Sequence, residues 1–324
     1  MSLLTVEDLH VWFDLPEGRE LHAVQGVSFA VDAGERFGLV GESGSGKTTT
    51  ILAVMGLLPA SASVSGRVLL DGEDLLARGE WSVSRHRWVD VAMVFQGAMN
   101  AFNPVKRIGD QIVEPMELHE VAEGREARRR TAELLERVGI PGERANRYPH
   151  EFSGGMRQRA AIAMALACTP KDLLADEPTT ALDVMVQAQI LELLVALAND
   201  FGLALVLVTH DLPIVAQVCG RAAVMYAGEI VESGPTDALY HDPRHPYTRL
   251  LFAATPDLYG DGEVVSIPGA PPRLDQPLVG CPFRPRCDSA FAPCETIHPD
   301  LLPVAAAHAA ACHLNTAVRE EAGR

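Results

Sequence analysis

The chain has 324 residues, of which 48% are hydrophobic, and its formal net charge at pH 7 is -16. This acidic balance argues against general nucleic-acid binding, which usually needs a basic surface. The N-terminus lacks the basic start and apolar core of a signal peptide, and no run approaches the roughly 18–20 apolar residues of a membrane span. We therefore expect a soluble, cytoplasmic chain whose six cysteines are thiols or metal ligands rather than disulfides.

The first motif is a glycine-rich loop between a predicted strand and a predicted helix. Strand-like sequence fills residues 3–31, Arg36–Val40 is short and partly apolar, and a helix is predicted over Thr48–Leu57. Between them, residues 41–48 fill every fixed position of the pattern G-x-x-x-x-G-K-S/T. In such a loop, backbone N–H groups at a helix start surround phosphate oxygens. The predicted nucleotide ligands are Gly41, Ser43, Gly44, Gly46, Lys47, Thr48 and Thr49.

Strands and helices alternate through the following 160 or so residues. An apolar strand over Val91–Phe95 stops at Gln96, and a helical insertion follows from Ile108. The pattern then predicts a helix over Gly155–Ala167, a strand over Asp172–Asp176, a helix over Asp183–Asn199 and a strand over Leu203–Val208. This alternation indicates a mainly parallel sheet with helices on both faces.

Two further segments carry groups suited to nucleotide chemistry. A carboxylate such as Asp176, at the end of a buried strand, can hold Mg²⁺, and Glu177 can polarise an attacking water. The alternative is a solvated turn before Pro178. Ser153-Gly154-Gly155 offers a hydroxyl and N–H groups at a helix start, which suits a phosphate. Taken alone, this segment is better explained as an ordinary N-cap, and its place about twenty residues before Asp176 and Glu177 favours the phosphate.

Together these motifs resemble the ATP-binding subunits of ABC transporters. The resemblance covers residues 3 to about 235 and rests on Gly41–Thr48, Gln96, Ser153–Gly155, Asp176–Glu177, Ala181–Asp183 and His210. It implies an α/β P-loop ATPase fold with a mixed parallel sheet, an antiparallel β subdomain and a helical subdomain at about 108–167. The chain would divide into an ATP-binding domain at 1–235 and a proline-rich, cysteine-bearing extension at 236–324.

The resemblance also implies roles for single residues. Two such ATPase domains meet head to tail in the family, so Ser153, Gly154 and Gly155 would bind the partner's ATP. His210 would contact the γ-phosphate, although a strand-end histidine that caps a loop is the plainer alternative. Phe13, or else Trp12, would stack on adenine, unless these rings are core packing. The implied catalytic residues are Lys47, Gln96, Glu177 and His210, and the implied Mg²⁺ ligands are Thr48, Gln96 and Asp176.

Longer segments resemble the dipeptide and oligopeptide importers, at residues 96–105, 148–159, 175–184, 245–251 and 280–287. They place the chain near the first of the two ATPase subunits of such an importer. It would act with a second homologous ATPase, two membrane permeases and, indirectly, an extracytoplasmic solute-binding protein, at the cytoplasmic face of a bacterial or archaeal membrane. The substrate does not meet this subunit, so nickel, oligosaccharide and other solutes stay open as alternatives to peptides.

Four cysteines mark the extension, at Cys281, Cys287, Cys294 and Cys312, with the spacing C-x₅-C-x₆-C-x₁₇-C. By count they suit zinc or a four-iron cluster equally, and the missing C-x₂-C knuckle favours the cluster. The resemblance likewise implies a 4Fe-4S cluster; unligated thiols are the alternative. Arg284 and Arg286 would offset its charge or be solvated. Cys168 and Cys219 are predicted core residues.

Two other classes of function deserve comparison. A soluble ABC protein of DNA repair or translation usually has two ATPase modules or a nucleic-acid-binding insertion, and this sequence shows neither. A metal-bearing interaction module with a vestigial ATPase would not need Lys47, Asp176, Glu177 and His210, all of which are present.

Overall fold

The computed structural model describes residues 2–77, 80–97, 101–254 and 266–315. The chain forms two compact units, each built from separate stretches of sequence. The first unit comprises Met1–Leu3, Val31–Glu35 and Leu76–Leu207, and the second comprises Leu4–Ala30, Arg36–Leu75 and Val208–Arg324. The predicted boundary at residues 235/236 stays a prediction.

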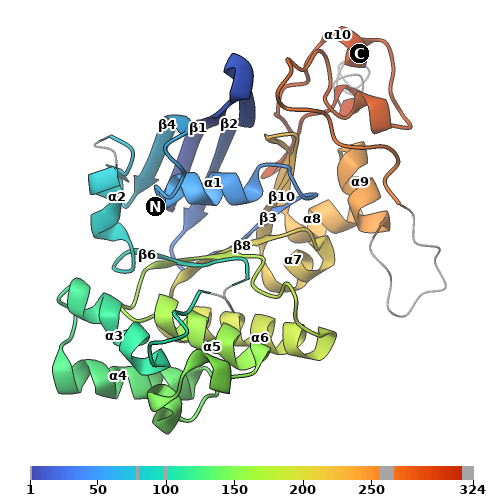
Figure 1. The fold of residues 1–324 in the computed structure, drawn as a ribbon. Coiled ribbons are helices and arrows are strands. Elements are labelled where there is room, and N and C mark those ends of the chain that lie inside the picture. Colours follow the sequence, from blue (N-terminus) through green and yellow to red (C-terminus); the bar gives the residue numbers. More distant parts are fainter. Residues whose placement is uncertain (1, 78–79, 98–100, 255–265, 316–324) are drawn as a thin grey trace. The chain divides into compact units, whose positions relative to one another are not determined.

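The first unit combines parallel strands with helices (Figure 1). Strands β6 (Val91–Val94), β7 (Asp172–Asp176) and most of β8 (Ala204–Thr209) are consecutive in the sheet. β6 and β7 run parallel, with Val94 opposite Ala175, and all their residues are buried, as in parallel sheets covered on both faces.

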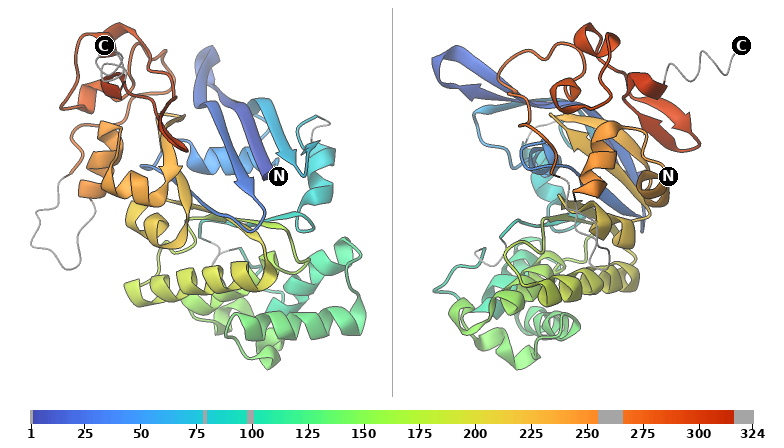
Figure 2. Two further views of the ribbon diagram at one scale, coloured as in Figure 1. Left: turned by 180° about the vertical axis from the view of Figure 1, so that it is seen from behind. Right: turned by 90° about the vertical axis from the view of Figure 1, so that its right-hand side faces the viewer.

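The helices of this unit are α2 (Glu80–His86), α3 (Ile108–Leu118), α4 (Gly124–Arg137), α5 (Gly154–Ala165) and α6 (Val184–Phe201), with short 3-10 turns η3 (Gly142–Asn146) and η4 (Pro149–Glu151). Helices α3 to α6 lie together in both views of Figure 2.

Helix α6 is, among the described residues, long and apolar enough to cross a membrane by length and composition. The expectation that no segment meets this criterion is therefore wrong for α6. Its buried residues Ile190, Leu194, Leu197 and Ala198 share one face, and Asp183 caps it by accepting a hydrogen bond from the Val186 N–H. A core helix of a globular protein passes the same test, so composition alone assigns α6 no place in a membrane.

The second unit contains an antiparallel sheet and a mixed sheet. The antiparallel sheet has the order β2-β1-β4-β5, formed by β1 (Ser2–Leu15), β2 (Arg19–Asp32), β4 (Ala62–Leu70) and β5 (Glu73–Asp74). In the mixed sheet, β3 (Arg36–Val40) runs parallel to β9 (Arg221–Tyr226), and β9 pairs antiparallel with β10 (Glu229–Pro235). A 3-10 turn, η1 (Pro16–Gly18), connects β1 and β2. The helices here are α1 (Lys47–Val54), α7 (Leu212–Val218), α8 (Thr236–His241), α9 (Pro246–Ala253) and α10 (Pro293–Thr296).

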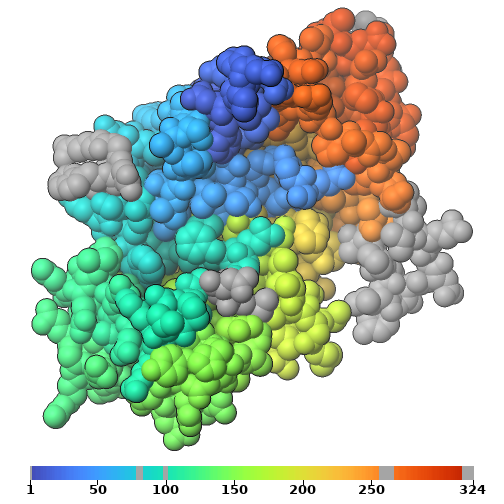
Figure 3. Space-filling model, in the orientation of Figure 1, coloured from blue at the N-terminus to red at the C-terminus, as the bar shows by residue number. Residues whose placement is uncertain are grey.

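The C-terminal segment of the second unit is attached to these sheets by strands and ion pairs. β11 (Leu302–Ala305) and β12 (His308–Ala310) form a hairpin, and β12 continues the mixed sheet beside β10. The fully buried carboxylate of Glu232 in β10 accepts hydrogen bonds from the His245 N–H (3.0 Å) and the His308 ring (2.7 Å). Arg19 pairs with Asp275 at 2.7 Å, where the C-terminal segment borders the N-terminal strands (Figure 3).

Asp172 is an exception to the apolar core of the first unit. It is the first residue of β7, opposite Val91 of β6, and it is fully buried. Neither of its side-chain oxygens has a hydrogen-bond partner among the described residues. Burial raises the pKa of this carboxyl to about 7, because desolvation disfavours the charged form. The carboxylate therefore costs the fold stability at neutral pH.

We expect Asp172→Leu to raise the melting temperature at pH 8 by several degrees and at pH 5 by less. The pKa of Asp172 in the folded state lies above its ordinary value of 3.8, so the protonated form favours folding. The stabilisation that protonated Asp172 contributes is complete below pH 3.8 and is lost as the pH rises through about 7. Thermal melts at both pH values, with Asp200→Leu at an exposed position as the control, measure the difference. An equal gain at both pH values would contradict the account.

Candidate nucleotide-binding site

The phosphate loop, residues 41–48, occupies the turn between β3 and α1, as predicted. Helix α1 begins at Lys47, and the preceding Gly46 has φ +102°. A Cβ at Gly46 would lie 2.7 Å from the Ala23 carbonyl oxygen, so this turn requires glycine. The nearly buried Lys47 ammonium donates hydrogen bonds to the carbonyl oxygens of Gly41 (2.7 Å) and Glu42 (2.8 Å). Ser43, Gly44 and Thr48 are exposed along the same loop, and Thr49 is half-buried.

In the first unit the structure brings Gln96 and Glu177 into contact. Both residues follow the carboxyl ends of neighbouring parallel strands, β6 and β7, so the register of these strands sets their side chains near one another. The Gln96 amide donates a hydrogen bond of 2.9 Å to a carboxylate oxygen of Glu177. The Thr180 hydroxyl donates to the same oxygen at 2.8 Å, a contact that the sequence analysis missed.

The backbone around Glu177 is strained. Asp176 ends β7 and is buried, whereas Glu177 is half-buried and has φ +42°. A residue with a Cβ adopts this left-handed conformation rarely, and such positions concentrate at functional sites. Asp176 and Glu177 therefore differ in environment, in line with the separate roles predicted for them.

Ser153 occupies the N-cap position of α5, where its hydroxyl oxygen accepts a hydrogen bond from the Met156 N–H at 3.3 Å. The capping alternative from the sequence is therefore observed, and the nucleotide contact of Ser153 and Gly154 stays a prediction. Gly155 has a packing reason of its own. A Cβ at this position would lie 2.9 Å from a methyl group of Val186, in the first turn of α6.

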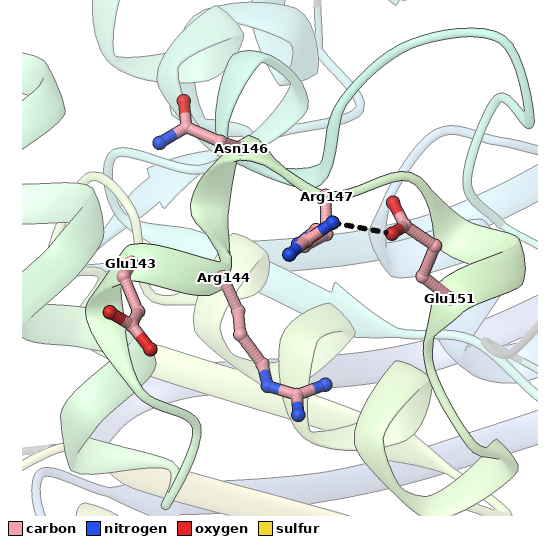
Figure 4. A pocket seen from close by; sticks show the side chains of 5 residues that line it. All are labelled: Glu143, Arg144, Asn146, Arg147 and Glu151. Carbon is pink, nitrogen blue, oxygen red and sulfur yellow. Dashed lines mark hydrogen bonds and ion pairs between the residues drawn. The ribbon is translucent and has the colours of Figure 1, made fainter.

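A polar pocket lies in the segment that leads to Ser153 (Figure 4). Its lining side chains come from the 3-10 turns η3 and η4 and the residues between them, and are Glu143, Arg144, Asn146, Arg147 and Glu151. Arg147 donates to Glu151 at 3.0 Å, and the Tyr148 N–H donates to the same carboxylate at 2.8 Å. Side chains of both charges therefore line this pocket.

The two candidate adenine-binding rings lie on opposite faces of β1, as alternation along a strand requires. The Trp12 ring stacks on those of His22 (4.6 Å between ring centroids) and His10 (5.3 Å). Phe13 is half-buried on the face that carries the fully buried Val11. Since Trp12 is already stacked, Phe13 is the better candidate of the two.

His210 directly follows β8 and is exposed, in the position that the sequence predicted. The next residue, Asp211, donates its N–H to the Thr209 hydroxyl (3.0 Å) and caps α7 by accepting from the Ile214 N–H (3.2 Å). The neighbouring residues therefore cap the loop and the helix. The γ-phosphate role of His210 itself stays a prediction.

The four cysteines of the extension line one pocket, together with residues that include His245 and Phe283. Burial raises the pKa of the Cys281 and Cys287 thiols, and it raises that of Cys312 to about 11; the charges of neighbouring thiolates act in the same direction. Among the described residues, no three Cys, His, Asp or Glu side chains form a group that could hold a metal ion. The predicted ligands thus share a pocket, but the metal site is not confirmed.

The other two cysteines are both buried, whereas the two arginines of the extension differ in exposure. Cys168 and Cys219 are buried, as predicted for core residues. Arg284 is exposed and lies 3.4 Å from Glu295, whereas Arg286 is buried and forms an ion pair with Glu42 of the phosphate loop at 2.6 Å. The sequence predicted the same environment for Arg284 and Arg286, because two residues of one short turn carry no local signal of burial.

Comparison with known proteins agrees with this geometry. The ABC transporter family model matches residues 24–180, and the model for the C-terminal region of oligopeptide/dipeptide transporters matches residues 231–294. The dipeptide transport ATP-binding protein DppD of Bacillus subtilis is 44% identical over 99% of this chain and 97% of its own length. The oligopeptide transport ATP-binding protein OppD of Mycobacterium tuberculosis is 48% identical over 96% of this chain, which spans about half (51%) of that relative.

Among solved structures, a dimeric ATP-binding cassette in a post-hydrolysis state, bound to ADP and Pi, superimposes with a TM-score of 0.64. It is 28% identical, and the match covers 72% of this chain and 98% of the other. The predicted ABC ATPase fold, with its parallel sheet, antiparallel sheet and helical segment, is thereby confirmed. This chain belongs to the ATP-binding proteins of the ABC transporters, in the oligopeptide and dipeptide branch of that family.

Proposed function

We propose that this chain binds and hydrolyses Mg²⁺-ATP and thereby energises the import of short peptides through partner membrane subunits. The observation that carries the proposal is the hydrogen bond of 2.9 Å between Gln96 and Glu177 at the end of parallel strands. It joins Gln96, a proposed Mg²⁺ ligand, to Glu177, the proposed general base. The family membership and the transport functions in the relatives' names support the same function.

Hydrolysis would proceed by attack of a water on the γ-phosphate, with Glu177 orienting the water and accepting its proton. Gln96 and Thr180 both donate to one oxygen of Glu177, and this fixes the orientation of the carboxylate. Lys47 and His210 would contact the phosphates. Mg²⁺ would neutralise phosphate charge, and its proposed ligands are Thr48, Gln96 and Asp176.

The remaining assignments concern assembly. Phe13 would stack on adenine, and Ser153, Gly154 and Gly155 would bind the ATP of a second, homologous ATPase subunit. Closure of that heterodimer on ATP would drive two permeases, which receive peptide from a solute-binding protein. The chain would act peripherally at the cytoplasmic face of the membrane, with no nucleic-acid partner.

We further propose that Cys281, Cys287, Cys294 and Cys312 hold a 4Fe-4S cluster, with Zn²⁺ as the alternative. All four thiols line one pocket, and this shared position supports the proposal. The raised pKa values of three of these thiols would fall on binding, because a metal centre stabilises thiolates.

Replacing the proposed general base should separate ATP binding from hydrolysis. We expect Glu177→Gln to keep ATP affinity and to lower turnover by about 100-fold or more, since a positioned base contributes about 10²–10⁴-fold. Phosphate release by the assembled transporter measures turnover, and Glu192→Gln on the exposed face of α6 is the matched control. Unchanged turnover in Glu177→Gln would refute the assignment.

Metal analysis tests the cysteine pocket. Anaerobically purified protein should contain iron and acid-labile sulfide, and Cys287→Ser should remove both, because a cluster needs its four thiolates. The control variant is Cys219→Ala, which removes a buried cysteine outside the pocket. Stoichiometric zinc without iron would overturn the cluster in favour of the alternative.

A further inference from the structure

Glu42, the second residue of the phosphate loop, is held at three points. Its carboxylate accepts two hydrogen bonds from the Arg286 guanidinium, at 2.6 and 3.0 Å. Its backbone N–H donates to the Tyr247 hydroxyl at 2.8 Å, and its carbonyl oxygen accepts from Lys47 at 2.8 Å. Two of these three contacts come from residues beyond 240, so the C-terminal segment determines the conformation of the loop at Glu42.

Arg286 is built into the core of the second unit. Its side chain is 3% exposed, against 26% for that of Glu42. The guanidinium also donates to the Pro268 carbonyl oxygen (2.7 Å) and lies 5.7 Å from the centroid of the Tyr226 ring. The hydrogen bonds to Glu42 raise the pKa of Arg286, so the group stays charged. A buried cation with these fixed contacts holds Glu42 in one geometry.

The charge of Glu42 makes this pair relevant to ATP. A carboxylate in a loop that surrounds a triphosphate repels it unless a cation lies beside the carboxylate. Arg286 supplies that cation and donates to Glu42 from both of its terminal nitrogens, and the burial of the pair limits screening by water and salt. The ion pair therefore removes the repulsion between the Glu42 carboxylate and the triphosphate, and it fixes the conformation of the loop at Glu42.

The same arginine belongs to the cysteine segment. It ends the 3-10 turn Arg284–Arg286, which lies between Cys281 and Cys287: the Arg284 N–H bonds to the Cys281 carbonyl (3.0 Å), and the Cys287 N–H bonds to the Arg284 carbonyl (3.2 Å). Phe283, fully buried, lines the cysteine pocket and packs on both Tyr226 and Tyr247. One small core thus separates the thiols from the phosphate loop.

We propose that Arg286 is a positioning residue for ATP binding, which acts through Glu42 and makes nucleotide affinity depend on the folding of the cysteine segment. The inference rests on the proposed binding of ATP by the phosphate loop, and it does not require a particular metal. Tyr247 supports the same contact from α9, through the N–H of Glu42.

A set of charge variants tests the pair. In the full-length chain, we expect Arg286→Met to weaken binding of a fluorescent ATP analogue by at least about tenfold, because removal of one partner of a buried pair leaves the other uncompensated. Arg286→Lys should restore part of the loss. In the assembled transporter KM for ATP should rise with kcat unchanged, since the arginine does not contact the reacting groups. The matched control is Arg284→Met, two residues away and exposed.

The double variant Glu42→Gln/Arg286→Met separates repulsion from loss of folding. With no carboxylate left unpaired in the loop, it should bind the analogue more tightly than Arg286→Met alone. A general loss of structure would not be reversed in this way. Wild-type affinity in folded Arg286→Met, or a double variant that binds no better than the single one, would overturn the proposal.

A second cycle tests the connection to the cysteines. We expect Cys287→Ser to weaken ATP binding through Arg286 and Glu42, so its effect should shrink in a Glu42→Gln background and the two changes should be non-additive. Unchanged ATP binding in Cys287→Ser, or additive effects, would overturn this part of the proposal. The variant Lys47→Ala distinguishes failure of the proposed function from failure of this inference alone. Absence of ATP binding by the wild type would refute the proposed function, whereas binding that is lost in Lys47→Ala but normal in Arg286→Met would refute only this inference.

Discussion

Parallel strands bring their carboxyl ends to the same edge of a sheet, and this constraint determines where the candidate catalytic residues of the first unit lie. β6 and β7 pair from Val91 opposite Asp172 to Val94 opposite Ala175. Gln96 and Glu177, each two positions beyond the last paired residue of its strand, meet in a hydrogen bond. A slip of one residue would turn their side chains to opposite faces. The buried apolar strands therefore set the geometry on which the proposed mechanism of hydrolysis depends.

The phosphate loop of the second unit is constrained differently. Its glycines allow the turn, but its shape at Glu42 is imposed from outside by Arg286 and Tyr247. These residues stand in a segment that β12 and the buried Glu232 attach to the mixed sheet. The extension therefore does more than carry the four cysteines, because two of its residues contact the phosphate loop directly.

The local motifs could be predicted from the sequence, because each one is a short pattern whose chemistry requires its spacing. The phosphate loop, the strand ends at Gln96 and Asp176 and the cap at Ser153 lie where the pattern put them. Long-range pairs could not be predicted. Glu42 and Arg286 are 244 residues apart, and nothing near either one distinguishes Arg286 from the exposed Arg284. The buried carboxylate of Asp172, which has no hydrogen-bond partner among the described residues, could not be predicted either, since burial depends on the partner strands.

The measurement that tests the central claim most directly is uptake of labelled di- and tetrapeptides by cells whose only copy of this chain carries Lys47→Ala, compared with wild-type cells. The account predicts that peptide uptake is lost, because the substituted chain cannot hold the phosphates of ATP. Normal peptide uptake, accompanied by a defect in the entry of nickel or sugars, would contradict the peptide assignment while retaining the ATPase. Normal uptake of all these solutes would contradict the role in import itself.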